Sequence, residues 1–357
     1  MFDIASAFDK VWHQGLLFKL AKIETPLYLI ELIADFLKDR TFSVKIDQFE
    51  TAKYNISCGV PQGAVISPTL FSIFINDVPI RYDNKKGQYS LLYADDLVFM
   101  AKFGKSTKTV EKDANKYLNE LEKWSNLWRL KFAPHKCSYT IFARTKRSAA
   151  VKLNLKMYNP RINEDKTPKF LGLIFDSQLS GKSHLVKIKK TCNSRLNIIR
   201  ILTHKSWGLR KETLIQIYKS LIRSVIEYMG MNYYAFGRAQ RNELEVIQNS
   251  ALRAILKKKR EDGNKNLLRE ANIESIRQRM NRLNCKYVEK SIKQGNPIVK
   301  DLIENYKGII EKDTNSGYIS GATILNQNKF CNRIIKEKLS RTSQTIRTAH
   351  LVCTSGD

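Results

Sequence analysis

Two consecutive aspartates interrupt a pair of apolar segments, and this feature constrains the fold more than any other in the sequence. Residues 89–93 and 97–101 are mostly apolar, and each run has the length of a typical strand. Asp95 and Asp96 lie in the short connection between them, which leaves room only for a tight turn. The sequence therefore predicts an antiparallel hairpin that projects two carboxylates from one edge of a sheet.

The remainder of the first 176 residues alternates between helical and strand patterns. Apolar residues spaced three or four apart predict helices near 8–20, 26–37, 68–78 and 110–124. A hairpin is predicted over 42–58, and short apolar runs predict strands over 139–142 and 170–175. Residues 1–3 resemble the middle of a strand, so we expect an N-terminally truncated chain. The order predicts an α+β fold with helices on one face of an antiparallel sheet.

Beyond residue 182 the strand patterns end, and helical periods cover 183–203, 210–229, 240–258 and 267–293. The first 180 residues carry 27 Lys and Arg against 19 Asp and Glu (+8), whereas the others carry 35 against 15 (+20). Most of the net charge of +28 thus lies in the helical half, which predicts a polyanionic partner. We predict domains over 1–180 and 181–300, with a boundary in 177–183, and a weakly patterned tail over 301–357.

A third carboxylate belongs with the acidic pair if the first strand lies beside the hairpin. Asp3 would then face Asp95 and Asp96. Like charges held close together repel, and a divalent cation relieves that repulsion. Carboxylate oxygens suit Mg²⁺, and such clusters can hold two metal ions about 3.5–4 Å apart. An isolated Asp-Asp pair is, however, more often ordinary turn chemistry.

Four segments, in order along the chain, resemble sequence boxes of reverse transcriptases. Residues 93–96 (YADD) resemble their metal-binding box, and residues 3–13 (DIASAFDKVWH) resemble the box that opens the palm in polymerases of non-LTR retrotransposons. Residues 59–68 (GVPQGAVISP) and 170–176 (FLGLIFD) resemble two further boxes of that group, the second being the hairpin that grips the primer. The chain is similar to jockey-like members, truncated at the start of the palm.

This resemblance implies a polymerase palm followed by an all-α basic thumb and a C-terminal helical region. The implied activity is RNA-directed DNA polymerisation, in which two Mg²⁺ ions, or Mn²⁺, assist transfer of a dNTP to a primer 3′-hydroxyl on an RNA template. Asp3, Asp95 and Asp96 would be the catalytic metal ligands. Lys136 would protonate the departing pyrophosphate or pair with the triphosphate, although an exposed strand lysine is an equally good interpretation.

The resemblance also implies substrate contacts. Phe8 stands where the family places the ring that blocks a ribose 2′-hydroxyl, but helical spacing also explains it as a core aromatic. Gln62 would lie over the incoming nucleotide or the template base. Gly59 and Gly63 would allow close backbone approach there, or simply serve turns. Asp9 would lie past the metal site, where helix capping is its expected role.

Basic residues of the helical half would grip nucleic-acid phosphates. The densest runs are Lys187, Lys189, Lys190, Lys257, Lys258, Lys259 and Arg260. The second run can also be a solvated helix end. Four aromatic residues lie among these helices as candidates for base stacking, although core packing explains them better: Tyr228, Tyr233, Tyr234 and Phe236.

The expected compartment is intracellular, either nuclear or cytoplasmic. Six separated cysteines show no metal-ligand spacing and are typical of reduced thiols. No apolar run approaches the roughly 18 residues of a membrane span.

Two alternatives to an active polymerase remain. One is a decayed, non-catalytic nucleic-acid-binding remnant, because the fingers that should precede the first box are missing. A group II intron-type maturase, which shares the YADD box, is the weaker alternative.

Overall fold

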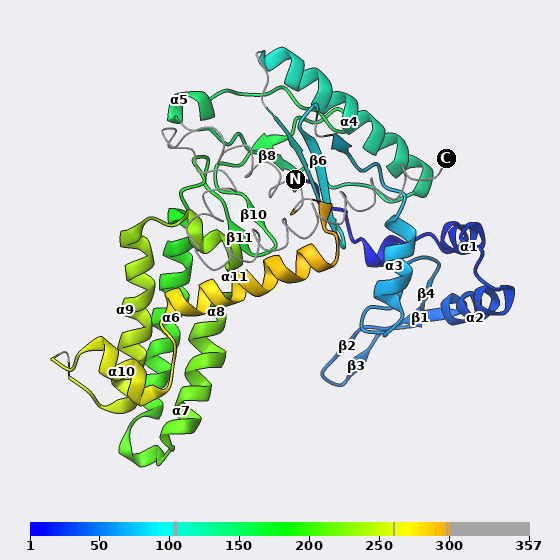
Figure 1. Ribbon diagram of the computed structural model, residues 1–357. Coiled ribbons are helices and arrows are strands. Elements are labelled where there is room, and N and C mark those ends of the chain that lie inside the picture. The colour runs from blue at the N-terminus through cyan, green and yellow to red at the C-terminus, as the bar shows by residue number, and fades with distance from the viewer. Residues whose placement is uncertain (84, 103–105, 144, 260, 298, 300–357) are drawn as a thin grey trace, which may run out of the picture. The chain divides into compact units, whose positions relative to one another are not determined.

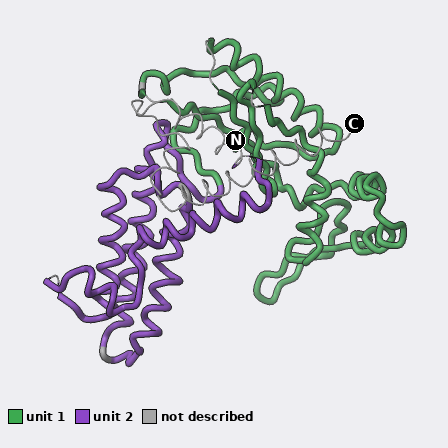
Figure 2. Tube along the Cα trace, viewed as in Figure 1, with its two compact units in different colours: residues 1–170 green, residues 171–357 purple. Residues whose placement is uncertain are grey.

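The computed structural model describes residues 1–299 apart from 84, 103–105, 144, 260 and 298. The chain forms two compact units, the first over residues 1–170 and the second beginning at Leu171 (Figure 2). This division comes earlier than the predicted 177–183 linker. Leu171 and Gly172 belong to the second unit because two of its side chains bind them. The Tyr228 hydroxyl donates to the Leu171 carbonyl at 2.6 Å, and Lys187 Nζ donates to the Gly172 carbonyl at 2.9 Å.

The central sheet of the first unit is antiparallel and contains the predicted acidic hairpin. Its order is β5 (Tyr82–Asp83), β6 (Gln88–Tyr93) and β7 (Asp96–Ala101). The predicted hairpin over 42–58 is also confirmed, with β1 (Arg40–Phe42) paired to β4 (Tyr54–Ile56) and β2 (Lys45–Ile46) to β3 (Phe49–Glu50).

Two strand predictions need correction. The strand predicted at 139–142 is β8 (Ser138–Tyr139), and it pairs in parallel with β9 (Asn163–Glu164), so the unit is not purely antiparallel. The single strand predicted over 170–175 is instead two short ones, β10 (Lys169–Phe170) and β11 (Leu173–Ile174). The chain turns between them because Leu171 and Gly172 have positive φ values of 45° and 81°.

The helices of the first unit are α1 (His13–Lys22), α2 (Leu27–Leu37), α3 (Ser67–Ile75), α4 (Thr107–Trp128) and α5 (Lys146–Ala149). The α4 helix lies along the sheet beside β6 (Figure 1), where the Tyr117 ring stacks on Phe99 with centroids 4.3 Å apart. The helix predicted from residue 8 is shorter than expected. Residues Phe8–Lys10 form a 3₁₀ turn, because the carbonyls of Phe8 and Val11 accept hydrogen bonds from the 59–60 loop.

A buried lysine fastens α1 to α3 and α4. Lys19 Nζ lies 3.6 Å from the Trp128 ring centroid and forms an ion pair with Asp77. The Trp124 indole N–H donates to the same Asp77 carboxylate at 2.8 Å. Burial lowers the pKa of Lys19, and the hydrogen bond to Asp77 opposes that shift. The charge is thus accommodated by the Asp77 carboxylate, the Phe74 backbone carbonyl and aromatic faces.

The second unit is helical, as predicted. Its helices are α6 (Lys182–Leu202), α7 (Lys211–Tyr218), α8 (Ser224–Glu227), α9 (Arg238–Leu256), α10 (Asn264–Ala271) and α11 (Ile276–Lys293). Lys219–Arg223 form a π-helical turn between α7 and α8. The helix predicted over 267–293 is divided, because Asn272 adopts a left-handed conformation and Ser275 caps a new helix with Gln278.

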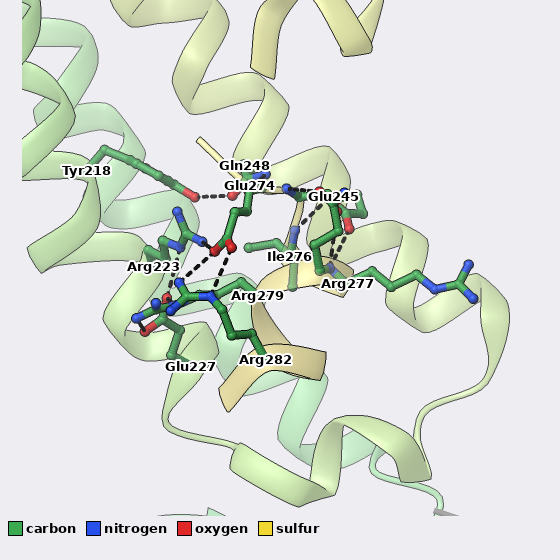
Figure 3. A network of polar contacts seen from close by, with 12 residues as sticks. Tyr218, Arg223, Glu227, Glu245, Gln248, Glu274, Ile276, Arg277, Arg279 and Arg282 are labelled. Carbon is green, nitrogen blue, oxygen red and sulfur yellow. Dashed lines mark hydrogen bonds and ion pairs between the residues drawn. The ribbon is translucent and has the colours of Figure 1, made fainter. Parts of the chain in front are cut away.

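Charged side chains join α8, α9 and α11 within this unit (Figure 3). Glu245 of α9 accepts hydrogen bonds from the first two backbone N–H groups of α11, those of Ile276 and Arg277. Arg223 is buried and pairs with Glu227 at 2.8 Å, and Glu227 also accepts from Arg279 at 2.7 Å. These bonds satisfy the helix terminus and neutralise the buried guanidinium.

Candidate active site

The acidic hairpin has a two-residue turn. The Tyr93 and Asp96 residues pair across the two strands, which leaves Ala94 and Asp95 as the turn. Ala94 has a positive φ of 50°, the conformation that tight hairpin turns demand of their first central residue. Asp95 therefore lies in the turn itself, and Asp96 begins the outgoing strand.

The first residues of the chain lie directly beside this outgoing strand. Phe2 and Leu97 exchange two backbone hydrogen bonds, of 2.7 and 3.1 Å, in an antiparallel bridge. This register sets Asp3 opposite Asp96, although 92 residues separate the two in sequence. The neighbour on the other side is the segment after α4, since the Ala133 N–H donates to the Asp3 carbonyl at 2.9 Å.

The three carboxylates influence one another electrostatically. The pKa of Asp96 is raised, first by burial and then by the nearby negative charges of Asp95 and Asp3. Asp3 Oδ2 is buried and lies 3.1 Å from Lys136 Nζ. Lys136 itself is more than half exposed. The site thus contains a carboxylate repulsion that a cation would relieve, together with one ammonium group that already offsets part of it.

A pocket of about 200 Å³ opens beside these groups. Its charged lining comes from Asp3, Asp96, Lys136, Asp165 and Lys169. Among the residues that the structure describes, no group of three or more His, Cys, Asp or Glu side chains is arranged to hold a metal ion. The donor set, with repelling carboxylates and a buried Asp3 oxygen that pairs with Lys136, suits a hard divalent cation. The metal assignment stays a prediction.

The 59–63 loop packs against the box that contains Asp3. The Gly59 N–H donates to the Val11 carbonyl at 2.7 Å and the Val60 N–H to that of Phe8 at 2.8 Å. A Cβ on Gly59 would lie 2.5 Å from the Asp9 carbonyl oxygen. Two sequence boxes about 50 residues apart therefore form one structural element, and Gly59 permits close approach of protein backbone.

The predicted substrate residues occupy different environments. The Phe8 ring is half-buried and stacks on Phe71 with centroids 4.6 Å apart, which agrees with its alternative interpretation as a core aromatic. Gln62 is exposed, and its Nε2 donates to Asp9 Oδ1 at 2.9 Å. The expected capping role of Asp9 is therefore wrong, because its carboxylate binds a side chain of another box. Gly63 has a φ of 92° and open space around it.

Sequence reasoning missed two residues that hold this loop. His13 Nε2 lies 2.8 Å from the Gly59 carbonyl oxygen. Arg40 donates to the carbonyls of Cys58 and Gly59 at 3.0 and 2.6 Å. His13 closes the box that begins at Asp3, so the box itself was the available signal. Nothing in the local pattern around Arg40 predicts its contact.

Some of the predicted phosphate-binding residues of the second unit already have partners within the protein. Lys187 bonds to the Gly172 carbonyl, Lys189 pairs with Glu243 at 2.5 Å, and Lys258 pairs with Glu270 at 3.3 Å. These three side chains are exposed, and so are Lys190, Lys257 and Lys259. Arg260 lies outside the described residues.

The aromatic residues proposed for stacking divide in a similar way. Tyr233, Tyr234 and Phe236 are buried core residues, as their helical spacing favours. Tyr228 is largely exposed, although its hydroxyl is bound to Leu171.

The comparisons with known proteins find related polymerases. Residues 1–175 match the family model described as reverse transcriptase (RNA-dependent DNA polymerase). The chain is 30% identical over 259 residues to the RNA-directed DNA polymerase from mobile element jockey of Drosophila melanogaster, which covers 71% of this chain and 28% of the relative. Its counterpart from Drosophila funebris is 31% identical over 260 residues, with the same coverage.

A third similar protein extends the match further along the chain. The probable RNA-directed DNA polymerase from transposon BS of Drosophila melanogaster is 26% identical over 293 residues, 81% of this chain and 32% of that protein. The chain therefore spans about a third or less of the length of these curated relatives.

Proposed function

This chain belongs to the reverse transcriptase family, and from that premise we propose that it is part of the RNA-directed DNA polymerase of a jockey-like non-LTR retrotransposon. Residues 1–180 form the palm with partial fingers elements, and 181–300 form the thumb and nucleic-acid-binding connection. The predicted C-terminal tail, 301–357, lies outside the described residues. The substrates are a dNTP, a DNA primer and an RNA template. The compartment is the nucleus or the cytoplasm.

One observation carries this proposal. The Phe2–Leu97 bridge sets Asp3 opposite Asp96 and next to the turn that contains Asp95. The sequence boxes alone supply these carboxylates from distant positions, and the backbone register explains how they can act together. The raised pKa of Asp96 supports the same conclusion, because burial and then the charges of Asp95 and Asp3 cause it.

Asp3, Asp95 and Asp96 are the residues that would hold two Mg²⁺ ions, or Mn²⁺. Bound metal ions would supply electrostatic stabilisation of the attacking and departing oxygens. Asp3 would leave its pairing with Lys136 when it binds a cation, which frees the lysine ammonium for the triphosphate or the departing pyrophosphate.

The remaining contacts are made by residues around the pocket and by the helical unit. Phe8, at the edge of the core, selects deoxyribose by its bulk. Gln62 and Gly63 face the nucleotide or the template base. The basic residues Lys187, Lys189, Lys190, Lys257, Lys258, Lys259 and Arg260 bind the phosphates of primer and template without reading sequence.

The test is incorporation of dTTP on poly(rA)/oligo(dT) with and without Mg²⁺. We expect metal-dependent incorporation that Asp95→Asn and Asp96→Asn reduce by at least a hundredfold, because each removes a charged metal ligand. Asp35→Asn, an exposed α2 residue, is the matched control and should leave the rate unchanged. Equal rates for all four proteins would refute the proposal.

A non-catalytic nucleic-acid-binding remnant is the second candidate. It is favoured by the net charge of +28, which suits nucleic-acid binding whether or not the chain is catalytic. Tight, salt-sensitive binding of the primer–template duplex together with no incorporation would support it. Binding that is indifferent to salt would count against it.

A further inference from the structure

The loop that contains Gln62 is fixed in two different ways. Its first residues are held by backbone hydrogen bonds from Gly59 and Val60 to the segment after Asp3. Gln62 lies at the exposed end of the loop, and it is bound there through its side chain, whose Nε2 donates to Asp9 Oδ1. The position of the Gln62 carboxamide therefore depends on one acidic residue from another sequence box.

The chemistry of this bond fixes the orientation of the amide. A carboxylate can only accept hydrogen bonds, so the amino group of Gln62 must face Asp9. The carboxamide oxygen and the second N–H then remain for another partner. A rotated amide would bring two acceptor oxygens together and is disfavoured.

Exposure argues against a purely structural role for the bond. Both side chains are exposed, and hydrogen bonds in such positions contribute little to the stability of a fold. A long glutamine side chain, in contrast, has many rotamers, and restricting them before a ligand arrives lowers the entropy lost on binding.

We propose that Asp9 is a positioning residue, which holds the Gln62 carboxamide in the orientation that meets the incoming nucleotide or its template base. This inference rests on the proposed function, since that function supplies the partner of Gln62. Asp9 acts through Gln62 and does not itself touch the substrate.

The first test measures binding without chemistry. The probe is dTTP, titrated with Mg²⁺ into the chain on poly(rA) with a dideoxy-terminated oligo(dT) primer. We expect Asp9→Ala to raise the Kd for dTTP about threefold, because the Gln62 side chain must then be ordered when the nucleotide binds. Asp9→Asn keeps an acceptor oxygen and should bind nearly as the wild type does.

A double-mutant cycle then separates positioning from a general structural effect. Gln62→Ala alone should also weaken dTTP binding, and adding Asp9→Ala to it should produce no further loss. Effects that multiply, or an unchanged Kd in Asp9→Ala, would overturn the inference. Glu50→Ala is the matched control, because Glu50 is an exposed carboxylate of the same unit that accepts a hydrogen bond from Ser43.

A third measurement does not depend on nucleotide binding. In the free chain labelled with ¹⁵N-glutamine, Asp9→Ala should shift the Gln62 side-chain amide resonance to the position of an unstructured glutamine, whereas Glu50→Ala should leave it in place. A wild-type resonance already at that position would contradict the inference. A wild-type chain that neither binds nor incorporates dTTP would instead refute the proposed function, and the resonance would still decide the role of Asp9.

Discussion

Two glycines of the 59–63 loop share a backbone conformation but differ in their surroundings. Gly59 and Gly63 have φ values of 86° and 92°, a backbone conformation that residues other than glycine rarely adopt. A Cβ at Gly59 would also collide with the Asp9 backbone, whereas Gly63 faces open space. Substituting each glycine by alanine therefore separates the destabilisation caused by backbone strain from that caused by a collision.

We predict that Gly59→Ala destabilises the chain by about 3 kcal/mol, because backbone strain and a collision act together. Gly63→Ala should cost about 1 kcal/mol from strain alone. Urea unfolding monitored by circular dichroism measures both changes. Equal losses for the two variants would contradict this interpretation of Gly59.

A second prediction at this scale concerns Asp96. Burial and neighbouring carboxylates raise its pKa, so the folded protein favours the protonated form. The associated stabilisation is present below pH 3.8, the ordinary pKa of the group, and is lost as pH rises through the higher folded-state pKa. Ionised Asp96 therefore opposes folding at neutral pH.

Asp96→Asn should accordingly raise both the melting temperature and the free energy of unfolding at pH 7. The gain in free energy should stay within about 1 kcal/mol, because the group is only partly buried. The gain should shrink as pH falls towards 3.8. Differential scanning calorimetry at several pH values measures it, and Asp35→Asn on exposed α2 serves as the control. A gain that does not depend on pH would argue against the electrostatic origin.

At the scale of elements, local pattern predicted some features and long-range contacts decided others. The acidic hairpin was predictable because an apolar run, a short turn and a second apolar run lie next to one another in sequence. The sequence did not predict that Phe8–Lys10 form a 3₁₀ turn separate from the following helix, because this depends on loop residues about 50 positions away. The break before α11 depends on Asn272 and the Ser275 cap, which the apolar spacing of 267–293 concealed.

The candidate site shows the same division. The sequence predicted the carboxylates by resemblance, but only the register of Phe2 and Leu97 relates Asp3 to the hairpin. The partner of Asp9 lies 53 residues away, so its local position at a helix start suggested capping instead.

The α8–α11 junction gives a prediction for a single element contact. Arg223 is buried between Glu227 and Glu274, whereas Arg282 pairs with Glu274 near the surface (Figure 3). Arg223→Met should destabilise the chain by about 2 kcal/mol, because it removes a charge-assisted hydrogen bond from a buried guanidinium to Glu227, which keeps Arg279 as its other partner. Arg282→Met should cost less than about 1 kcal/mol. Urea denaturation compares the two, and a similar cost for both would exclude a special role for the buried arginine.

At the scale of the whole molecule, the net charge of +28 predicts electrostatic binding of nucleic acid. Each phosphate neutralised contributes about 0.9 to the slope of log affinity against log salt concentration. Lysines that already pair with a glutamate should contribute less than lysines without such a pair among the described residues. Lys190 and Lys189 are neighbours that differ in this respect, since Lys189 pairs with Glu243.

We therefore expect Lys190→Ala to lower the salt slope for a primer–template duplex by close to 0.9. Lys189→Ala should lower the slope by less, because Lys189 already pairs with Glu243. Fluorescence anisotropy between about 50 and 200 mM salt provides the slopes. A larger effect at Lys189 than at Lys190 would show that the ion pair with Glu243 does not govern phosphate binding.

Mn²⁺ binding followed by electron paramagnetic resonance shows whether Asp3 acts together with Asp95 and Asp96 on divalent ions. We expect Asp3→Asn, Asp95→Asn and Asp96→Asn each to weaken Mn²⁺ binding by at least about tenfold, since each removes a charged oxygen ligand. Asp35→Asn should leave binding unchanged. Wild-type affinity in Asp3→Asn would contradict the account.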